Sequence, residues 1–172
     1  NPQFDLPGYT VTSNVDMDGV KKISRAFEEA KKPLLLVGHG AMISGAGKVV
    51  MSFAEKMGVP VTNTLLGKGC FPETHKLSVG MLGMHGTAYA NKAVVDCDLI
   101  MSIGSRWDDR IVGKLSEFCN DAVKIHIDID PAEMGKMVVP DVSVVGDARS
   151  VMERLLEESV PGKTEAWIDQ IQ

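Results

Sequence analysis

Two arginines and two aspartates occur within five residues, in the segment Arg106-Trp107-Asp108-Asp109-Arg110. The segment follows an apolar stretch, residues 98–104, that is typical of a buried strand. Arginine binds phosphate and carboxylate groups through paired hydrogen bonds, so this cluster could recognise an anionic ligand. The alternative is two local ion pairs on a solvated loop, each worth about 0–1 kcal/mol.

Three other apolar stretches end in residues that could also contact a ligand. One leads into Gly38-His39-Gly40, whose glycines let the backbone approach a ligand closely. Ile43 replaces the third glycine of a dinucleotide-binding pattern, so a plain tight turn explains this segment equally well. The other two stretches end at Asp128-Ile129, where a carboxylate could accept from ribose hydroxyls, and at Gly146-Asp147. Helix capping is the alternative for both of these ends.

A fifth segment, Gly80-Met81-Leu82-Gly83-Met84-His85-Gly86-Thr87, combines small residues with two methionines. Such a loop could lie against a flat apolar ring, and His85 could donate a hydrogen bond. A flexible loop whose methionines fill the core is the alternative.

The sequence offers no pattern for catalysis or for a metal site. His39, His75 and His126 lack metal-ligand spacing to cysteines or carboxylates, and no Ser-His-Asp arrangement is indicated. We therefore predict neither catalytic nor metal-binding residues. A free-standing NAD-dependent dehydrogenase is disfavoured, because both the complete glycine pattern and a hydride-transfer acid or base are missing.

Apolar periodicity alternates between strand and helix along the chain. Helices are predicted over 16–32, 49–57, 89–97, 110–118 and 147–156, and strands over 34–37, 59–63, 98–104, 123–129 and 142–145. We therefore predict an α/β fold, a Rossmann-like three-layer α/β/α sandwich with a mainly parallel sheet of five or six strands. Ligands of such sheets bind beyond the carboxyl ends of the strands, where the segments described above lie.

The composition limits the class of protein. The 172 residues suffice for one domain, and a net charge of -5 argues against nucleic-acid binding. A run of about 18 apolar residues, as a membrane span needs, is missing from the sequence. Cys70, Cys97 and Cys119 form no CxxC pair, which indicates reduced thiols and a cytoplasmic location.

Three motifs in order closely resemble the large subunit of acetolactate synthase (acetohydroxyacid synthase), in the central domain of that thiamine-diphosphate enzyme. They are residues 80–87, Ser105-Arg106-Trp107-Asp108-Asp109-Arg110, and His126-Ile127-Asp128-Ile129-Asp130-Pro131-Ala132-Glu133. The resemblance implies an N-terminal linker over 1–13, a central FAD-binding domain over 14–160 and an exit linker over 161–172. The domains that hold thiamine diphosphate and Mg²⁺ would lie outside this chain.

The resemblance also implies the activity. The full enzyme condenses two 2-oxo acids, pyruvate with pyruvate or 2-oxobutyrate, in branched-chain amino acid biosynthesis. It is expected to be a homo-oligomer, with a possible regulatory small subunit, while the isolated domain is expected to be inactive. The alternative is a non-catalytic scaffold domain of another thiamine-diphosphate enzyme, with an empty or ADP-binding cleft.

By motif match, the resemblance assigns residues to FAD and to a substrate channel. Members usually have three glycines where this chain has Gly38-His39-Gly40. The FAD contacts would be Gly38, Gly40, Thr64, Leu65, Leu66, Leu82, Gly83, Met84, His85, Gly104, Ser105, Arg106, Asp108, Arg110, Asp128, Ile129, Gly146 and Asp147. The channel would be lined by Met84, Asp109 and Arg110.

Overall fold

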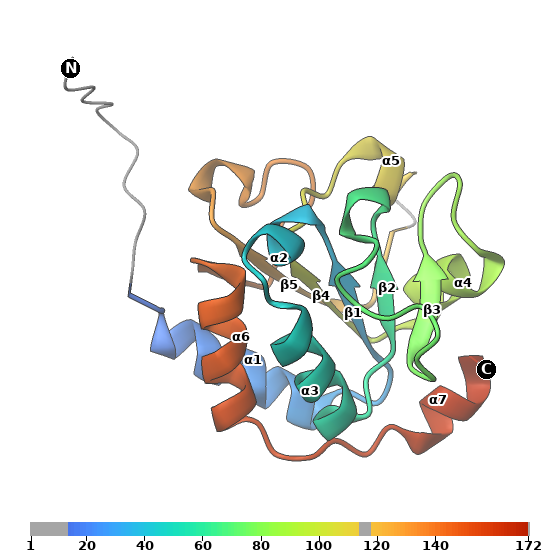
Figure 1. Cartoon of the computed structure of the whole chain (residues 1–172), viewed down its shortest axis with the longest axis horizontal. Coiled ribbons are helices and arrows are strands. Elements are labelled where there is room, and N and C mark those ends of the chain that lie inside the picture. Colours follow the sequence, from blue (N-terminus) through green and yellow to red (C-terminus); the bar gives the residue numbers. More distant parts are fainter. Residues whose placement is uncertain (1–13, 114–117, 172) are drawn as a thin grey trace.

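A computed structural model describes residues 14–113 and 118–171 (Figure 1). Its helices are α1 Met17–Glu29, α2 His39–Ile43, α3 Gly47–Met57, α4 Ala88–Asp96, α5 Asp109–Val112, α6 Ala148–Glu158 and α7 Glu165–Ile171, with 3-10 turns η1 Leu65–Gly67 and η3 Pro131–Glu133. Its strands are β1 Pro33–Val37, β2 Val61–Asn63, β3 Ser78–Met81, β4 Leu99–Ile103, β5 Val123–Asp128 and β6 Val142–Val145.

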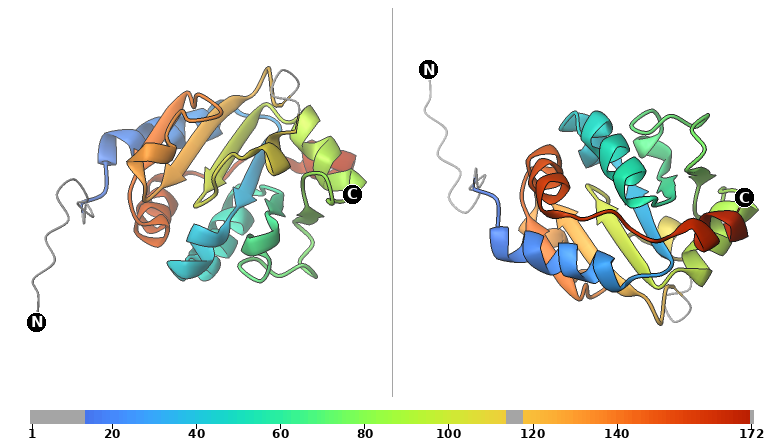
Figure 2. Two further views of the ribbon diagram at one scale, coloured as in Figure 1. Left: turned by 90° about the horizontal axis from the view of Figure 1, so that it is seen from above. Right: turned by 90° about the horizontal axis from the view of Figure 1, so that it is seen from below.

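Within the described residues, these strands form one six-stranded sheet with the order β3-β2-β1-β4-β5-β6, and every neighbouring pair is parallel. Helices cover both faces, so the predicted α/β/α sandwich is confirmed (Figure 2). This strand order places the topological switch point between β1 and β4. The carboxyl ends of these two central strands therefore mark the expected ligand edge.

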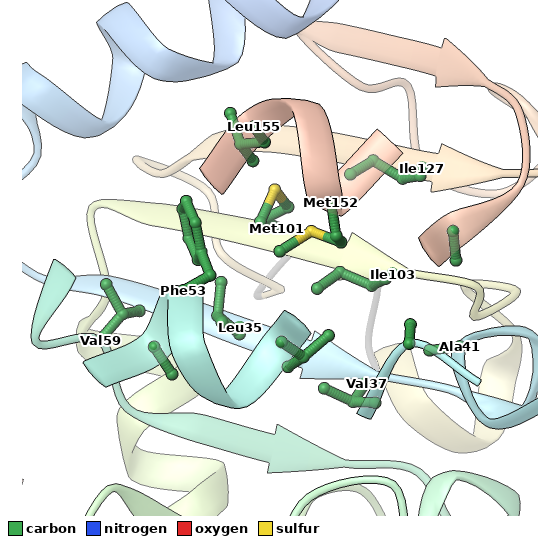
Figure 3. Packing of buried hydrophobic residues seen from close by; sticks show 14 of the residues in the cluster. Leu35, Val37, Ala41, Phe53, Val59, Met101, Ile103, Ile127, Met152 and Leu155 are labelled. Atoms are coloured by element: carbon green, nitrogen blue, oxygen red, sulfur yellow. The ribbon is translucent and has the colours of Figure 1, made fainter. Parts of the chain in front are cut away.

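Successive residues of β1 and β4 alternate between two hydrophobic layers. Leu35, Val37 and Met101 face the layer under α1, α3 and α6, where Phe53 and Leu155 join them (Figure 3). Leu34, Leu36 and Ile100 face the other layer, which holds α4, Trp107, Phe118 and Trp167. Because both faces are covered, the strands are apolar almost throughout, as the sequence pattern predicted.

Several element boundaries differ from the prediction for identifiable reasons. Helix α1 ends at Glu29, because the backbone N–H groups of Lys31 and Lys32 bind the Asp98 carboxylate at 2.8 Å each. Helix α5 covers only Asp109–Val112 among the described residues, and Gly113 follows it with a left-handed φ of 58°. Residues 114–117 of the predicted helix, and the predicted linker over 1–13, lie outside the described residues.

Three segments near the ligand edge also fold differently from the prediction. Strand β2 begins at Val61 instead of residue 59. The predicted loop over 80–87 begins inside the edge strand β3, Ser78–Met81, although Gly80 at φ 85° breaks its strand-like pattern. The loop predicted at Gly38-His39-Gly40 contains the start of the short helix α2, whose Gly40 N–H donates to the Gly104 carbonyl at 2.9 Å.

The C-terminal segment packs on the domain. After α6 the chain runs past the amino ends of the strands to the other face of the sheet, where it ends in α7 (Figures 1 and 2). Trp167 is buried, and its Nε1 donates to the Pro33 carbonyl at 3.0 Å. Thr164 donates to the Gly58 carbonyl. The domain boundaries themselves stay a prediction.

The three cysteines are free and buried. The sulfurs of Cys97 and Cys119 lie 3.9 Å apart, and each thiol reaches the Val94 carbonyl. The hydrogen bond to Cys119, followed by burial, raises the pKa of Cys97. Cys97 is therefore a poor nucleophile. Among the described helices, none is long and apolar enough to cross a membrane.

Candidate functional site: a cleft at the strand carboxyl ends

A cleft of about 800 Å³ opens at the carboxyl ends of the central strands. Its lining comes from the segments that follow β1, β2 and β4, from the last residues of β3 and β5, and from the loop before α4. The lining residues are His39, Gly40, Thr64, Leu65, Leu66, Met81, Leu82, Met84, His85, Gly104, Ser105, Arg106, Asp108, Arg110, Ile111 and Asp128. The cleft lies at the edge predicted from the fold class.

Most of the predicted site residues meet in this cleft. The exceptions are Gly38, Gly83, Ile129, Gly146 and Asp147, which lie outside its lining. Two predicted channel residues, Met84 and Arg110, line the cleft, whereas the side chain of Asp109 lies outside what the structure describes. His39, Met81 and Ile111 line the cleft but are not among the predicted contacts. Met81 lies in the segment 80–87 that was predicted to face an apolar ring, whereas the apolar side chain of Ile111 gave no signal that would separate it from a core residue.

The glycines at the switch point serve chain packing. A Cβ at Gly38 would overlap the carbonyl oxygen of Gly104 and lie 2.5 Å from the Cβ of Ser105. A Cβ at Gly40 would lie 2.9 Å from the Cα of Gly104, which itself has a φ of 59°. The ends of β1 and β4 therefore touch each other, so the interpretation that the glycines of 38–40 let a ligand approach is not needed to explain Gly38.

One wall of the cleft is apolar and open to solvent. Thr64 caps the 3-10 turn η1 by accepting from the Gly67 N–H at 3.0 Å, and this turn presents Leu65 and Leu66, which are 69% and 63% exposed. Met84, on the loop before α4, is 77% exposed. Large apolar side chains that gather around a cleft are typical of a surface that another group covers.

Asn91 of α4 fixes the loop that carries Met84. Its side chain accepts from the Gly83 N–H at 2.9 Å and donates to the Gly83 carbonyl at 3.0 Å. A Cβ at Gly83, whose φ is 95°, would lie 2.5 Å from the carbonyl oxygen of Arg110. Gly83 therefore allows the loop before α4 to lie against α5, and this contact helps to position the cleft lining.

The segment after β4 supplies charged residues to the cleft lining. Arg106 Nη2 lies 3.7 Å from Asp108 Oδ2, in a side chain that is 68% exposed. Asp108 also accepts from the Arg110 N–H at 3.2 Å and so caps the first turn of α5. The local ion pair that the sequence left as an alternative is thus present at Asp108, which also lines the cleft.

Strand β5 ends in a carboxylate above a buried imidazole. Asp128 lines the cleft and accepts from the Asp130 N–H at 3.0 Å. His126, two residues earlier on the same face, is 1% exposed, and its Nε2 lies 2.9 Å from the Ser105 carbonyl oxygen. Burial lowers the pKa of His126, although Asp128 opposes this effect. The buried ring is therefore neutral at neutral pH.

The last two predicted residues hold the neighbouring strand end. Asp147 accepts from the Ser150 N–H at 2.9 Å and caps α6, and the Gly146 N–H donates to the Asp128 carbonyl at 2.9 Å. Capping, the alternative left open from the sequence, is thus present at Asp147. Ile129, just after β5, is 43% exposed.

These groups suit a ligand that has an anionic part and a flat apolar part. Arg106 and Arg110 can bind phosphate, and Asp128 can accept from hydroxyl groups. The wall of Leu65, Leu66 and Met84 can cover an apolar ring. Among the described residues, no group of three or more His, Cys, Asp or Glu side chains could hold a metal ion.

Comparisons with known proteins agree with the fold and with the sequence motifs. The family described as "Thiamine pyrophosphate enzyme, central domain" matches residues 20–155. The "Probable acetolactate synthase large subunit" of Methanocaldococcus jannaschii is 44% identical over 172 residues, which cover 98% of this chain and 29% of that protein. The "Acetolactate synthase large subunit" of Corynebacterium glutamicum is 45% identical over 175 residues, 99% of this chain and 28% of that protein.

A third relative, the "Acetolactate synthase large subunit" of Parasynechococcus marenigrum, is 49% identical over 149 residues, 84% of this chain and 24% of that protein. The chain thus spans less than a third of the length of these relatives. The resemblance found in the motifs is confirmed, and with a match that covers most of its length the chain belongs to the family of thiamine pyrophosphate enzyme central domains.

Proposed function

We propose that this chain is the central domain of an acetolactate synthase large subunit and that its cleft binds FAD. The names of the relatives support the first part. The second part rests on one observation: two arginines, a carboxylate and an exposed apolar wall share one cleft at the switch point of the sheet.

The charged side of the cleft fits the adenosine diphosphate half of FAD. Arg106 and Arg110 supply fixed positive charge for the two phosphates. Asp128 is an acceptor at the end of a strand, where nucleotide hydroxyl groups are commonly bound. Arg106 forms an ion pair with Asp108 at 3.7 Å, which keeps its side chain near the cleft when no anion is bound.

The apolar side of the cleft fits the flavin ring. Leu65, Leu66 and Met84 are large, exposed side chains, and a flat ring laid against them would remove apolar surface from water. His85 also lines the cleft and could donate to a ring acceptor. FAD can exchange two electrons, but the condensation of two 2-oxo acids with loss of CO₂ is redox-neutral, so a structural role of FAD is expected.

The condensation itself would belong to a longer protein. Thiamine diphosphate and Mg²⁺ would be bound by residues outside this chain, while Met84, Asp109 and Arg110 would contribute to the passage that the 2-oxo acids take. We expect the isolated chain to form no acetolactate from pyruvate, because no described residue could hold and activate a thiazolium. Homo-oligomers of the full subunit, with or without a regulatory subunit, belong to the same proposal.

Calorimetric titration with FAD and with ADP tests the cleft. Arg106→Ala should weaken binding of both ligands by about 10- to 100-fold, the loss expected for one charge-assisted hydrogen bond. Arg154→Ala is a matched control, because Arg154 is also exposed and ion-paired, to Glu157 on α6, but lies outside the cleft lining. A wild-type chain that binds neither ligand, or equal losses for the two variants, would contradict the proposal.

The alternative is a scaffold domain whose cleft takes ADP or stays empty. The open apolar wall favours this for the isolated chain, since nothing described here covers Met84. We therefore expect FAD and ADP to bind with similar affinity. FAD binding that is about a hundredfold tighter, or about 2.7 kcal/mol, would show that this wall holds the ring unaided.

A further inference from the structure

We propose that His126 is a positioning residue for the cleft: from the sheet beneath, it holds both neighbours of Arg106 and thereby directs the Arg106 side chain toward the ligand. The role of the ligand in this inference rests on the proposed function. The positioning role can be measured without a ligand, so the two proposals can fail separately.

The first contact is a hydrogen bond to the residue before Arg106. His126 Nε2 lies 2.9 Å from the carbonyl oxygen of Ser105, and Ser102 Oγ donates to the same oxygen at 3.2 Å. Ser102 and His126 are partners in the β4–β5 register, so two adjacent strands converge on this one carbonyl. A carbonyl oxygen only accepts, so Nε2 carries the ring hydrogen.

The second contact is a ring stack with the residue after Arg106. The Trp107 and His126 rings are nearly parallel, with centroids 4.9 Å apart and an interplanar angle of 13°. Trp107 is buried, and its other aromatic neighbour is Phe118, at 6.2 Å. The imidazole therefore fixes the turn on both sides of Arg106.

Alternation along the turn then sets the direction of Arg106. Ser105 and Trp107 are buried, whereas the Arg106 side chain between them is 68% exposed and lines the cleft. If Ser105 and Trp107 lost their contacts to the ring, the turn could rotate and Arg106 would no longer have a fixed position. Because the fork of arginine must be oriented to bind phosphate, this loss would weaken ligand binding.

His126 serves this purpose through one donor and one flat face. Among the described residues, neither the buried His126 Nδ1 nor Trp107 Nε1 has a hydrogen-bond partner. Asp128 Oδ2 lies 3.9 Å from Nε2, beyond hydrogen-bond distance, so the carboxylate remains available to the cleft. A glutamine at position 126 can supply a donor of similar reach, but a leucine cannot.

The test compares His126→Leu, His126→Gln and Ile127→Val by ADP titration. Ile127 is buried on the same strand but faces the opposite layer, so its truncation disturbs packing without touching the turn. We expect about a tenfold loss of affinity for His126→Leu, a loss below about threefold for His126→Gln, and none for Ile127→Val. His126→Leu added to Arg106→Ala should cost little more affinity than Arg106→Ala alone, because His126 acts through the Arg106 guanidinium.

The inference is overturned if His126→Leu binds ADP like the wild type, or if His126→Gln loses as much as His126→Leu. Should His126→Leu not fold, Ser102→Ala takes its place, since it removes the other donor to Ser105; a loss of affinity supports the inference and an unchanged affinity contradicts it.

A ligand-free measurement separates the two proposals. Trp107 is one of two tryptophans in the sequence, so a Trp167→Phe background reports on it alone. In that background, His126→Leu should increase quenching of Trp107 fluorescence by acrylamide, and Ile127→Val should not. Increased quenching with no ADP or FAD binding by the wild type refutes the proposed function alone, and unchanged quenching refutes the positioning role.

Discussion

Replacing Trp167 with alanine should destabilise the whole domain, although the residue lies near the end of the described chain. Its ring is 2% exposed, its Nε1 donates to the Pro33 carbonyl at 3.0 Å, and Lys32 Nζ lies 5.6 Å from its ring centroid. A buried tryptophan removes about 150–250 Å² from water, which corresponds to about 4–6 kcal/mol at about 25 cal/mol per Å². This is an upper estimate, because an unfolded chain already buries part of that area.

We therefore expect Trp167→Ala to lower the free energy of unfolding by about 3–5 kcal/mol. Typical domains have only about 5–15 kcal/mol, so the change is a large share of the total. Trp167→Phe keeps most of the apolar area but leaves the Pro33 carbonyl without its donor, and should cost about 1–2 kcal/mol.

Urea unfolding, followed by circular dichroism, measures these differences. Tyr89→Ala is the control, since Tyr89 is also a large aromatic residue but is 67% exposed, and its loss should cost less than about 0.5 kcal/mol. A cost below about 1 kcal/mol for Trp167→Ala would refute the reasoning, because it would mean that the segment after residue 160 acts as a linker with no share in the fold.

Three further predictions follow from the same contacts. Gly38→Ala should cost at least about 3 kcal/mol in urea unfolding, because its Cβ would overlap the backbone of the turn that follows β4. Gly146→Ala should cost far less, because its Cβ would lie 3.2 Å from a valine methyl carbon, and equal costs would contradict this. Burial lowers the pKa of His126 in the folded state, so on acidification the unfolded chain takes up a proton at this residue before the folded chain does. The stability that the neutral His126 ring contributes should be complete above its ordinary pKa of 6.5 and should be lost as the pH falls through its lowered pKa in the folded state. The free energy of unfolding should therefore fall between pH 7.5 and 5 relative to that of His126→Gln, and parallel curves would exclude a neutral buried ring. Cys97 and Cys119 are buried, so they should react with a thiol reagent only at the rate of unfolding, and rapid labelling of the native chain would refute this.

The strand ends could be predicted from the sequence because apolar runs fix the strands and parallel strands end at one edge. This is why Gly40, Arg106 and Asp128, which are far apart in the sequence, were expected at one site and lie at one cleft. The family resemblance assigned Leu65 and Met84 to the site. The apolar pattern alone gives no reason to expect that these two side chains are exposed.

The remaining features depend on contacts distant in sequence. Strand β3 forms because β2 offers a free edge, not because Gly80 favours an extended chain, and the pairing shifts register near Val61. Trp167 is held by the start of β1, a partner 134 residues away that no local pattern indicates. Asn91 accepts from the Gly83 N–H in the preceding loop, a contact that the apolar periodicity of the helix does not indicate.

The burial of His126 could have been predicted from the sequence. Because side chains alternate along β5, His126 lies on the other face of the strand from Ile125 and Ile127, and this pattern suggests an outward-facing residue. In a parallel sheet both faces are covered, however, so a histidine in such a strand must be buried and must find a partner. The chain-order neighbour β4 is the obvious source of that partner, and its carboxyl-end turn carries Arg106.

The cleft therefore combines a rigid floor with an open wall, and the two parts have different physical causes. The floor is rigid because Gly38 and Gly104 allow β1 and β4 to touch, and because His126 holds the turn after β4. The wall is open because Leu65 and Met84 stand on turns that the described chain does not cover. Substitutions in the floor should consequently affect stability and ligand affinity together, whereas substitutions in the wall should affect only the affinity for a ligand long enough to reach it.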